Sequence, residues 1–369
     1  MKPNDPRPMF EEICQQTEII RELISNRKAI TQDFVSLMKQ KDICKIYLTG
    51  AGSPLYAAEV MRIAAIKLLN VDATAYPPSL FTSHIGFDTR HLSPDQMLLI
   101  CPAESGHSKG QVDAARAAHQ LNIPVVCTTL NPTGVLAREC DVVLAKPGEH
   151  EKAYVTTKGQ TIALLLVLMC LIDAAFALNQ ITEKEYSKYL SALNALPDNI
   201  EQTINNALSW FYQHEEMVMS ADTYRFFGYG ANFGTVNECA LKIAESVRKP
   251  SFCYELEETL HGPMISMSEK DLLFLLATEP GYERDRTIKL AQILSKITSN
   301  VVVIQSSNKK TFNNNDLLIQ TGDIEFIDAI GYMIPAQVIA FKVSDNLGID
   351  TTIDPYDDLH KAMETKYSD

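Results

Sequence analysis

Two glutamates and a lysine stand at helical spacing in the second half of the chain. Glu238, Lys242 and Glu245 occupy positions i, i+4 and i+7, which share one face of a helix. A carboxylate that lies beside a cation in a partly desolvated pocket can act as a base near neutral pH. His261 follows in the same stretch and offers a second group able to move protons. The pattern predicts a proton-transfer site.

A second interpretation of the same residues stays open at this point. Glu–Lys pairs at this spacing most often lie on the solvated face of an amphipathic helix, and His261 would then belong to an ordinary turn. The preceding residues favour the first interpretation, because the strand-like run 224–229 ends in a turn at Gly230. In open α/β sheets, such β-turn-helix units bind ligands beyond the carboxyl end of the strand.

Another candidate segment is the turn from Glu104 to Ser108, which follows a strand-like run ending at Cys101. Its small residues and hydroxyl groups suit an anion such as phosphate, which backbone amides and serine hydroxyls can bind. The competing interpretation is a simple helix start, in which the Ser108 side chain caps the helix. This segment by itself does not decide between the two.

Two glycine turns resemble a dinucleotide-binding fingerprint but lack its third glycine. After Gly50 and Gly52 the required position holds Leu55, and after the later turn it holds Phe233. The chain also has no Walker A lysine motif, and its His, Cys and Asp residues show no metal-ligand spacing. We therefore expect neither a nicotinamide dehydrogenase nor a metal site.

Alternating strand and helix patterns must position these residues. The alternation predicts parallel sheets covered by helices on both faces, and one β-turn-helix plan begins twice, near Ile43 and near Tyr224. The expected strands are 43–48, 98–101, 125–128, 142–144, 225–230, 272–276 and 301–304. The expected helices are two within 8–40, then 55–69, 109–121, 182–218, 235–248, 283–297 and 327–346.

Composition limits the partners of the chain. Its 369 residues are enough for two α/β domains, and 46% hydrophobic with 21% charged residues is a normal globular balance. The formal net charge of −13 argues against nucleic acid and anionic membranes as partners, because both need a basic surface. A phosphorylated metabolite stays compatible with this charge, because local amides and hydroxyls can bind it.

The cysteines and the apolar segments indicate a cytoplasmic protein. The eight cysteines form no Cys-x-x-Cys pair and mostly lie in apolar patterns, as reduced core thiols do. The first residues contain no apolar signal core. The apolar run 161–178 is marginal for a membrane span, which needs about 20 apolar residues, and it contains Asp173. A single buried helix explains this run better.

Taken together, these segments resemble the sugar isomerase (SIS) domain family. They are most similar to the tandem-SIS isomerase half of glucosamine-6-phosphate synthases and to stand-alone fructosamine-6-phosphate deglycases. The resemblance covers about residues 25–365 and implies two SIS domains. Each would be a parallel sheet flanked by helices in three αβα layers, with flavodoxin-like or Rossmann-like topology. The expected parts are N-terminal helices (1–42), a first SIS domain (43–180), a helical connector (181–220), a second SIS domain (221–349) and a tail that contributes to the site (350–369).

The resemblance also implies catalytic roles. The glutamate that matches Glu245 shuttles a proton between C1 and C2 of the open-chain sugar in this family, and the residues that match Glu238 and Lys242 position substrate and tune the site. The histidine that matches His261 opens the sugar ring from across a dimer interface, which implies a homodimer. A C-terminal lysine forms an imine with the ketose, and Lys361 matches it best.

The resemblance further implies a set of residues that bind the substrate and its phosphate. These are Gly52, Ser53, Glu104, Ser105, Gly106, Ser108, Tyr154 and Thr157. The chain departs from the family here, because Ala103 and Glu104 stand where Ser and Gln are common. A carboxylate repels a phosphate dianion unless it is protonated or paired, so we expect Lys109 to offset Glu104 or the Glu104 side chain to turn away.

Several functions follow as hypotheses. The first is a cytoplasmic enzyme that isomerises an amino-sugar or fructosamine phosphate and forms or hydrolyses its imine, without metal or organic cofactor. An ammonia-dependent glucosamine-6-phosphate synthase or deaminase is a variant of it. The alternatives are a non-catalytic SIS sensor of a sugar phosphate and an aldose–ketose isomerase without amine chemistry. No Cys nucleophile follows Met1, so we expect no glutamine-driven synthesis by this polypeptide.

Overall fold

The computed structural model describes residues 7–368, which divide between two compact units. Of the described residues, the first-sheet unit comprises Ile19–His150, Lys158–Ser191 and 354–368. The second-sheet unit comprises 7–18, Glu151–Thr157 and Ala192–Ile353. Each unit therefore takes segments from distant parts of the sequence, and each is described separately below.

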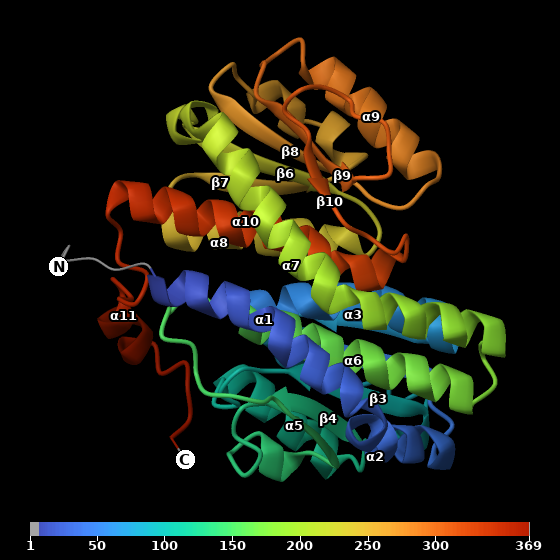
Figure 1. The fold of residues 1–369 in the computed structure, drawn as a ribbon. Helices are drawn as coiled ribbons and strands as arrows, with labels where there is room; N and C mark the ends of the chain where they lie inside the picture. Colours follow the sequence, from blue (N-terminus) through green and yellow to red (C-terminus); the bar gives the residue numbers. More distant parts are fainter. Residues whose placement is uncertain (1–6, 369) are drawn as a thin grey trace. The chain divides into compact units, whose positions relative to one another are not determined.

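The first-sheet unit is built on five parallel strands in the order β2-β1-β3-β4-β5. Figure 1 labels two of these strands, β3 and β4. This is the flavodoxin-like order, in which the strand order reverses between β1 and β3. Its strands are β1 (Lys45–Thr49), β2 (Asp72–Tyr76), β3 (Met97–Pro102), β4 (Val125–Thr129) and β5 (Val142–Ala145). Its helices are α2 (Arg27–Gln40), α3 (Ser53–Leu69), α4 (Pro78–Leu80), α5 (Lys109–Gln120), α6 (Lys158–Ala177) and α11 (Asp357–Ala362), with short turns η1 (Phe81–Ile85), η2 (Pro94–Gln96) and η3 (Ala137–Glu139).

The second-sheet unit repeats the same topology. Its five parallel strands follow the order β10-β9-β8-β6-β7, so the reversal falls between β6 and β8. The strands are β6 (Thr223–Gly228), β7 (Ser251–Glu255), β8 (Asp271–Ala277), β9 (Val301–Ser306) and β10 (Leu317–Ile319). The helices are α8 (Asn232–Val247), α9 (Tyr282–Leu294) and α10 (Glu325–Leu347), with turns η4 (Glu258–Leu260) and η5 (Pro263–Ser266). Helices α1 (Arg7–Ser25) and α7 (Glu183–Ser220) each contribute residues to both units.

The structure confirms the predicted fold class and every strand that the sequence predicted. The prediction missed three strands, β2, β7 and β10, which all lie at or near a sheet edge. The central strands β3 and β8 are buried throughout and read as continuous apolar runs, as strands covered on both faces do. The three missed strands are short or only partly buried, so their sequences carry little pattern.

Within the part of the chain that the structure describes, two helices are long and apolar enough to cross a membrane by length and composition. They are α6 and α10, whose most apolar windows are 89% and 100% buried inside the structure. For α6 this agrees with the predicted buried helix. Asp173 within α6 pairs with Arg27 of α2 and accepts a hydrogen bond from Thr31, so its charge has partners inside the helix layer.

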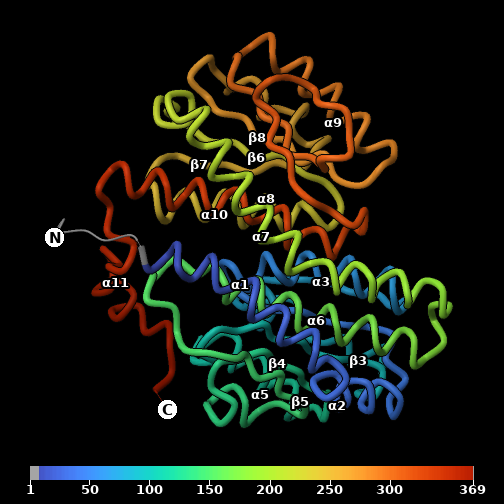
Figure 2. The backbone as a smooth tube through the Cα atoms, in the orientation of Figure 1, coloured from blue at the N-terminus to red at the C-terminus, as the bar shows by residue number. Residues whose placement is uncertain are grey.

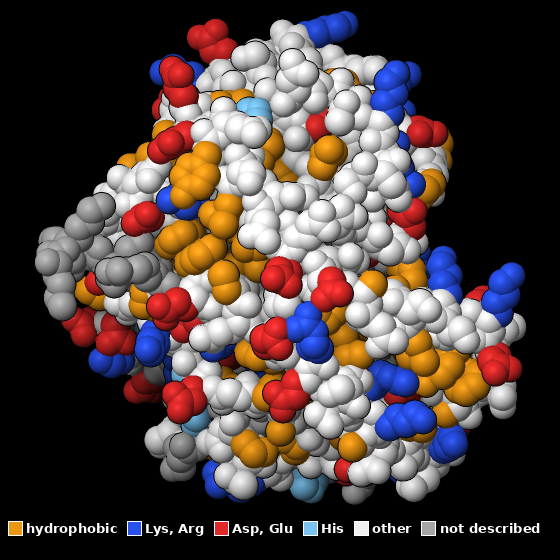
Figure 3. Space-filling model, viewed as in Figure 1, with side chains coloured by type: hydrophobic (Ala, Val, Ile, Leu, Met, Phe, Trp, Pro, Cys, Tyr) orange, Lys and Arg blue, Asp and Glu red, His pale blue; other side chains and the backbone are white. Residues whose placement is uncertain are grey.

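Charged side chains of both signs are interspersed on the face drawn in Figure 3. No large continuous area of Lys and Arg appears on that face, in keeping with the net charge of −13. A face of this kind offers no electrostatic footprint for nucleic acid.

Candidate functional site

Helix α8 carries the predicted proton-transfer residues and begins directly after the β6 glycine turn. The side chains of Glu238, Lys242 and Glu245 lie together, as their spacing predicts. The Lys242 Nζ atom is 3.3 Å from Oε1 of Glu238 and 2.8 Å from Oε2 of Glu245. The same ammonium group donates a hydrogen bond of 2.8 Å to the carbonyl oxygen of Thr156.

Burial distinguishes this cluster from a surface ion pair. The side chains of Glu238 and Lys242 are each 1% exposed, whereas the Glu245 side chain is 31% exposed. The interpretation of a solvated Glu–Lys pair is therefore wrong for this helix. Of the two carboxylates, Glu245 is the one that a ligand can reach.

Electrostatics fix the charge of Lys242. Burial acts to lower the pKa of Lys242, but the neighbouring charges of Glu238 and Glu245 outweigh burial and raise its pKa above the ordinary value. Lys242 is therefore a permanent cation beside Glu245. A cation in this position favours the ionised form of a carboxylate, which is the form that accepts a proton.

His261 lies in the same unit, in an exposed segment between η4 and η5. Its backbone N–H donates to the carbonyl of Glu258 at 3.0 Å. Buried Arg225 on β6 anchors the following turn through hydrogen bonds to the Ser266 hydroxyl and carbonyl at 3.1 and 3.0 Å, and pairs with Asp271 at 2.6 Å. Among residues 7–368, no described hydrogen bond or ion pair joins the His261 ring to Glu245.

Two residues predicted to bind substrate instead contact protein groups in this unit. The Tyr154 hydroxyl donates a 2.6 Å hydrogen bond to the main-chain carbonyl of Glu245, so it holds the end of α8. Thr157 is fully buried, and its hydroxyl and amide donate to the Glu151 carboxylate at 2.6 and 2.9 Å. These contacts give both residues a structural part in the second-sheet unit.

The remaining predicted ligand residues lie at the carboxyl edge of the first sheet. Gly52 has φ of +63° and precedes α3, whose first residue, Ser53, is buried. Gly106 has φ of +74°, and a β-carbon there would come within 2.9 Å of the Thr129 hydroxyl, so only glycine fits this turn. Ser105 accepts the amide of His107 at 3.4 Å.

Ser108 stands at the start of α5, but its side chain makes no capping hydrogen bond. The alternative of a turn capped by the Ser108 hydroxyl is therefore not what the structure shows. Instead, the backbone of Ser108 forms an isolated antiparallel bridge with Lys366 of the C-terminal tail. The Lys109 amide donates to the Thr365 carbonyl at 3.0 Å, and the Tyr367 amide donates to the His107 carbonyl at 2.8 Å.

Glu104 has a partner that the sequence did not reveal. Its carboxylate forms an ion pair with Lys146, which follows β5 and whose side chain is 1% exposed. A β-carbon at Gly159 would collide with the same carboxylate, so Glu104 lies against the first turn of α6, where a negative charge is favourable. The expected partner Lys109 instead has its ammonium group 5.7 Å from the centre of the Tyr367 ring.

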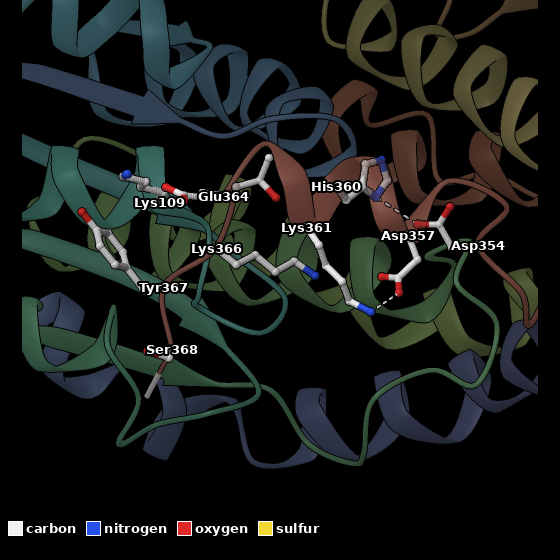
Figure 4. A pocket seen from close by; sticks show the side chains of 10 residues that line it. Lys109, Asp354, Asp357, His360, Lys361, Glu364, Lys366, Tyr367 and Ser368 are labelled. Atoms are coloured by element: carbon white, nitrogen blue, oxygen red, sulfur yellow. Dashed lines mark ion pairs between the residues drawn. The ribbon is translucent and has the colours of Figure 1, made fainter.

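Lys361 lines a pocket of about 600 Å³ between the tail and the start of α5 (Figure 4). The tail runs from α11 back toward the first sheet (Figure 2). The pocket is lined by Lys109, Asp354, Asp357, His360, Lys361, Glu364, Thr365, Lys366, Tyr367 and Ser368. Lys361 pairs with Asp357 at 2.5 Å, and this hydrogen bond raises the pKa of Lys361. Figure 4 shows the Lys366 side chain extended toward Lys361.

The predicted residues thus fall into two groups. Glu238, Lys242, Glu245 and His261 belong to the second-sheet unit, whereas the 104–108 turn and Lys361 belong to the first-sheet unit. Sequence reasoning missed Lys146, although a lysine directly after a strand at the ligand edge was a usable signal. Sequence reasoning also missed the backbone bridge between Ser108 and Lys366 of the C-terminal tail, for which the sequence carries no signal. Within residues 7–368, no group of three or more His, Cys, Asp or Glu side chains could hold a metal ion.

Comparisons with known proteins agree with the two repeated sheets of the fold. The model of the SIS domain matches the chain twice, over residues 37–173 and 217–344. A glutamine–fructose-6-phosphate aminotransferase (isomerizing) of Streptococcus agalactiae serotype V is 23% identical over 367 residues. This match covers 97% of the chain but only 58% of that relative's length.

Two solved structures share the fold. The C-terminal domain of glucosamine-fructose-6-phosphate aminotransferase from Francisella tularensis has a TM-score of 0.84 at 18% identity, covering 93% of this chain and 97% of that one. Tagatose-6-phosphate ketose/aldose isomerase from Escherichia coli has a TM-score of 0.74 at 22% identity, covering 94% and 95%. With two matched domains that span most of its length, the chain belongs to the SIS domain family as a tandem-SIS protein, related to the isomerase part of glutamine–fructose-6-phosphate aminotransferase.

Proposed function

We propose that the protein is a sugar-phosphate isomerase or deglycase that acts on amino-sugar or fructosamine phosphates. The observation that carries the proposal is the partly exposed Glu245 carboxylate, held 2.8 Å from a buried, permanently charged Lys242. This arrangement gives α8 one reachable base and a fixed cation beside it. The names of the relatives, an isomerizing aminotransferase and a ketose/aldose isomerase, are in keeping with such chemistry.

In the proposed reaction, Glu245 removes a proton from C1 of the open-chain ketosamine and returns it to C2. The electron pair of the C–H bond forms the C1=C2 double bond of an enaminol, while the C2 carbonyl oxygen takes a proton and becomes a hydroxyl group. Protonation at C2 then draws the nitrogen lone pair into a protonated imine at C1. Water then adds to the imine carbon, and the amine leaves with the proton. Each step needs a base or acid near neutral pH, which Glu245 and His261 would supply.

Lys361 is the proposed imine-forming amine. Its pocket lies in the tail, and its neighbour Asp357 keeps it protonated in the absence of ligand. A nucleophilic amine must be neutral, so a ligand that draws Asp357 away from Lys361 would activate it. The phosphate of the substrate would bind at the 104–108 turn, where pairing of Glu104 with Lys146 removes the charge conflict.

We further propose a cytoplasmic homodimer in which His261 serves the partner's site. His261 is exposed in the single chain and has no described bond to Glu245 among residues 7–368, as expected of a residue that serves another copy. A small-molecule sugar phosphate would be the only ligand, with no metal or organic cofactor in the reaction.

Deuterium wash-in tests the proposal. Purified protein is incubated in D₂O with fructose 6-phosphate plus ammonium, with glucosamine 6-phosphate, or with a fructosamine 6-phosphate, and NMR follows C1 and C2. Exchange that the wild type catalyses and Glu245→Gln does not would support proton transfer and show which substrate class is used. Absence of exchange with all three would count against the proposal and favour a non-catalytic sensor of sugar phosphates.

A further inference from the structure

We infer that helix α10 positions the proton-transfer helix by holding α8 at both of its ends, through Glu325 and Ser344. The two helices pack side by side in the second-sheet unit (Figure 1). The inference deepens the proposed function, because it concerns how the chain places Glu245. Glu325 and Ser344 contact main-chain groups at the two ends of α8, so both act on the position of the helix.

The first hold is at the start of α8. The residue at the N-cap position is Ala231, whose side chain cannot accept a hydrogen bond, so the helix lacks a cap of its own. Oε1 of Glu325 accepts the Ala231 amide at 2.7 Å. This carboxylate, supplied by another helix, therefore satisfies the amide at the N-cap position and complements the positive end of the helix dipole.

The backbone is shaped around this contact. Gly230 has φ of +56°, and a β-carbon there would collide with the Glu325 carboxylate. Glu325 is only 8% exposed, so water competes little for its hydrogen bond. The glycine of the β6 turn thus makes room for an internal carboxylate, which fixes the axial position of α8.

The second hold is at the other end of α8, next to the reacting residue. The Ser344 hydroxyl lies 2.9 Å from the carbonyl of Ser246, which directly follows Glu245. Ser344 is fully buried, and its hydroxyl also lies 2.7 Å from the Ala340 carbonyl of its own helix. The Tyr154 hydroxyl bonds the neighbouring Glu245 carbonyl at 2.6 Å.

Hydrogen bonds at both ends of α8 restrict its translation and rotation. They therefore fix the position of its side chains relative to a bound substrate. Misplacement of a reacting group by about 1 Å can cost about 100-fold in rate. Removing a hold should therefore lower kcat more than it raises KM, because substrate contacts from other elements persist. It should also expose the start of α8 to amide exchange.

The test uses the full chain with four variants and two readouts. Glu325→Ala removes the first hold, Glu325→Gln keeps an acceptor oxygen without the charge, and Ser344→Ala removes the second. Ser295→Ala is the matched control, because its hydroxyl also bonds a carbonyl four residues back in its own helix, at 2.8 Å, but it lies at the end of α9. The readouts are hydrogen–deuterium exchange of peptides from α8 and the steady-state rate of C1–C2 exchange.

We expect Glu325→Ala to speed amide exchange at Ala231 and its neighbours at least tenfold and to lower kcat at least tenfold, with KM within threefold. Glu325→Gln should stay within threefold of wild type in both readouts. Ser344→Ala should lower kcat severalfold, and Ser295→Ala should change neither readout.

Faster amide exchange with unchanged kcat in both Glu325→Ala and Ser344→Ala would overturn the positioning role. Unchanged amide exchange in both variants would show that the contacts of Glu325 and Ser344 do not stabilise the ends of α8. If the wild type exchanges no substrate hydrogen, the proposed function fails, and amide exchange still decides on the two holds. If Glu325→Ala does not fold, the comparison of Ser344→Ala with Ser295→Ala decides on the positioning role.

Discussion

The carboxylate of Glu104, which follows β3 at the carboxyl edge of the first sheet, is paired with the buried ammonium group of Lys146. The two residues differ in exposure, with 27% for the Glu104 side chain and 1% for Lys146. The pair is therefore asymmetric: water can solvate Glu104 if Lys146 is removed, but it cannot solvate Lys146 if Glu104 is removed.

This asymmetry predicts unequal costs of the two single substitutions. Glu104→Ala should lower the free energy of unfolding by about 3–5 kcal/mol, because it removes the carboxylate that is paired with a buried ammonium group. Lys146→Met should cost about 1–3 kcal/mol, and the double variant less than Glu104→Ala alone. Urea denaturation of the four proteins measures these differences. A larger cost for Lys146→Met than for Glu104→Ala would show that the pairing is described wrongly.

Removal of the reachable carboxylate on α8 should abolish proton transfer without unfolding the protein. We expect Glu245→Gln to lower the rate of C1–C2 exchange by about 10²- to 10⁴-fold, the usual contribution of a general base. Glu257→Gln is the matched control, since Glu257 is an exposed glutamate paired with Arg286. Equal rates in the two variants would remove Glu245 from the mechanism.

Lys242 should be needed for folding as well as for tuning. Lys242→Met removes the cation beside the buried carboxylate of Glu238 and should cost about 3–5 kcal/mol of unfolding free energy. Adding Glu238→Gln should recover part of this cost, because the buried negative charge is then also removed. Urea denaturation of the wild type, the single variant and the double variant measures these differences. A double variant that is less stable than Lys242→Met would contradict the prediction.

Asp357 should control the reactivity of Lys361. The pKa of Lys361 is raised by its hydrogen bond to Asp357, so Asp357→Asn should lower it and increase the neutral fraction at pH 7. We expect faster trapping of a fructose 6-phosphate imine by borohydride in Asp357→Asn, and none at this site in Lys361→Ala. Peptide mass spectrometry locates the label. Trapping on Lys366 instead would move the imine role to that residue.

Asp328 should make stability depend on pH. Burial raises the pKa of Asp328 to about 6, even though the amides of Gly322 and Ile324 donate to its carboxylate. Its folded-state pKa is above its ordinary value of 3.8, so its contribution is complete below about pH 4 and is lost as pH rises through 6.

The matching experiment compares the wild type with Asp328→Asn. The stability of the variant relative to wild type should rise by about 2 kcal/mol between pH 4 and pH 7, since one pKa unit corresponds to about 1.4 kcal/mol and the unfolded group is already partly ionised at pH 4. Asp323 and Glu279, the charged neighbours of Asp328, are present in both proteins, so their titration largely cancels in the comparison. A pH-independent difference would show that Asp328 titrates normally.

The sequence predicts the fold well because buried parallel strands are continuous apolar runs. Residues 272–276 and 301–304 are apolar throughout and therefore predict buried strands. Both segments lie in strands whose residues are all buried. Strand β2, Asp-Ala-Thr-Ala-Tyr, has one buried residue in five, so neither face shows a pattern. Edge strands pair on one side only, and their sequences are correspondingly less constrained.

The candidate site is predictable where it is local in sequence. The Glu238–Lys242–Glu245 cluster follows from helical spacing over eight residues. The pairing of Glu104 with Lys146 spans 42 positions, and the hold of Glu325 on Ala231 spans 94. Such contacts depend on how strands and helices pack, and no spacing rule within one element reveals them.

The route of the chain through its two units has a consequence for dissection of the protein. Residues 151–157 belong to the second-sheet unit, although the segments before and after them belong to the first-sheet unit. They supply Tyr154 and Thr156, which bond to residues of α8. The tail likewise returns to the first-sheet unit after α10 has ended. Neither half can therefore be excised as one continuous gene fragment with all its parts. Circular permutants or co-expressed pieces, rather than simple truncations, are the way to study one half alone.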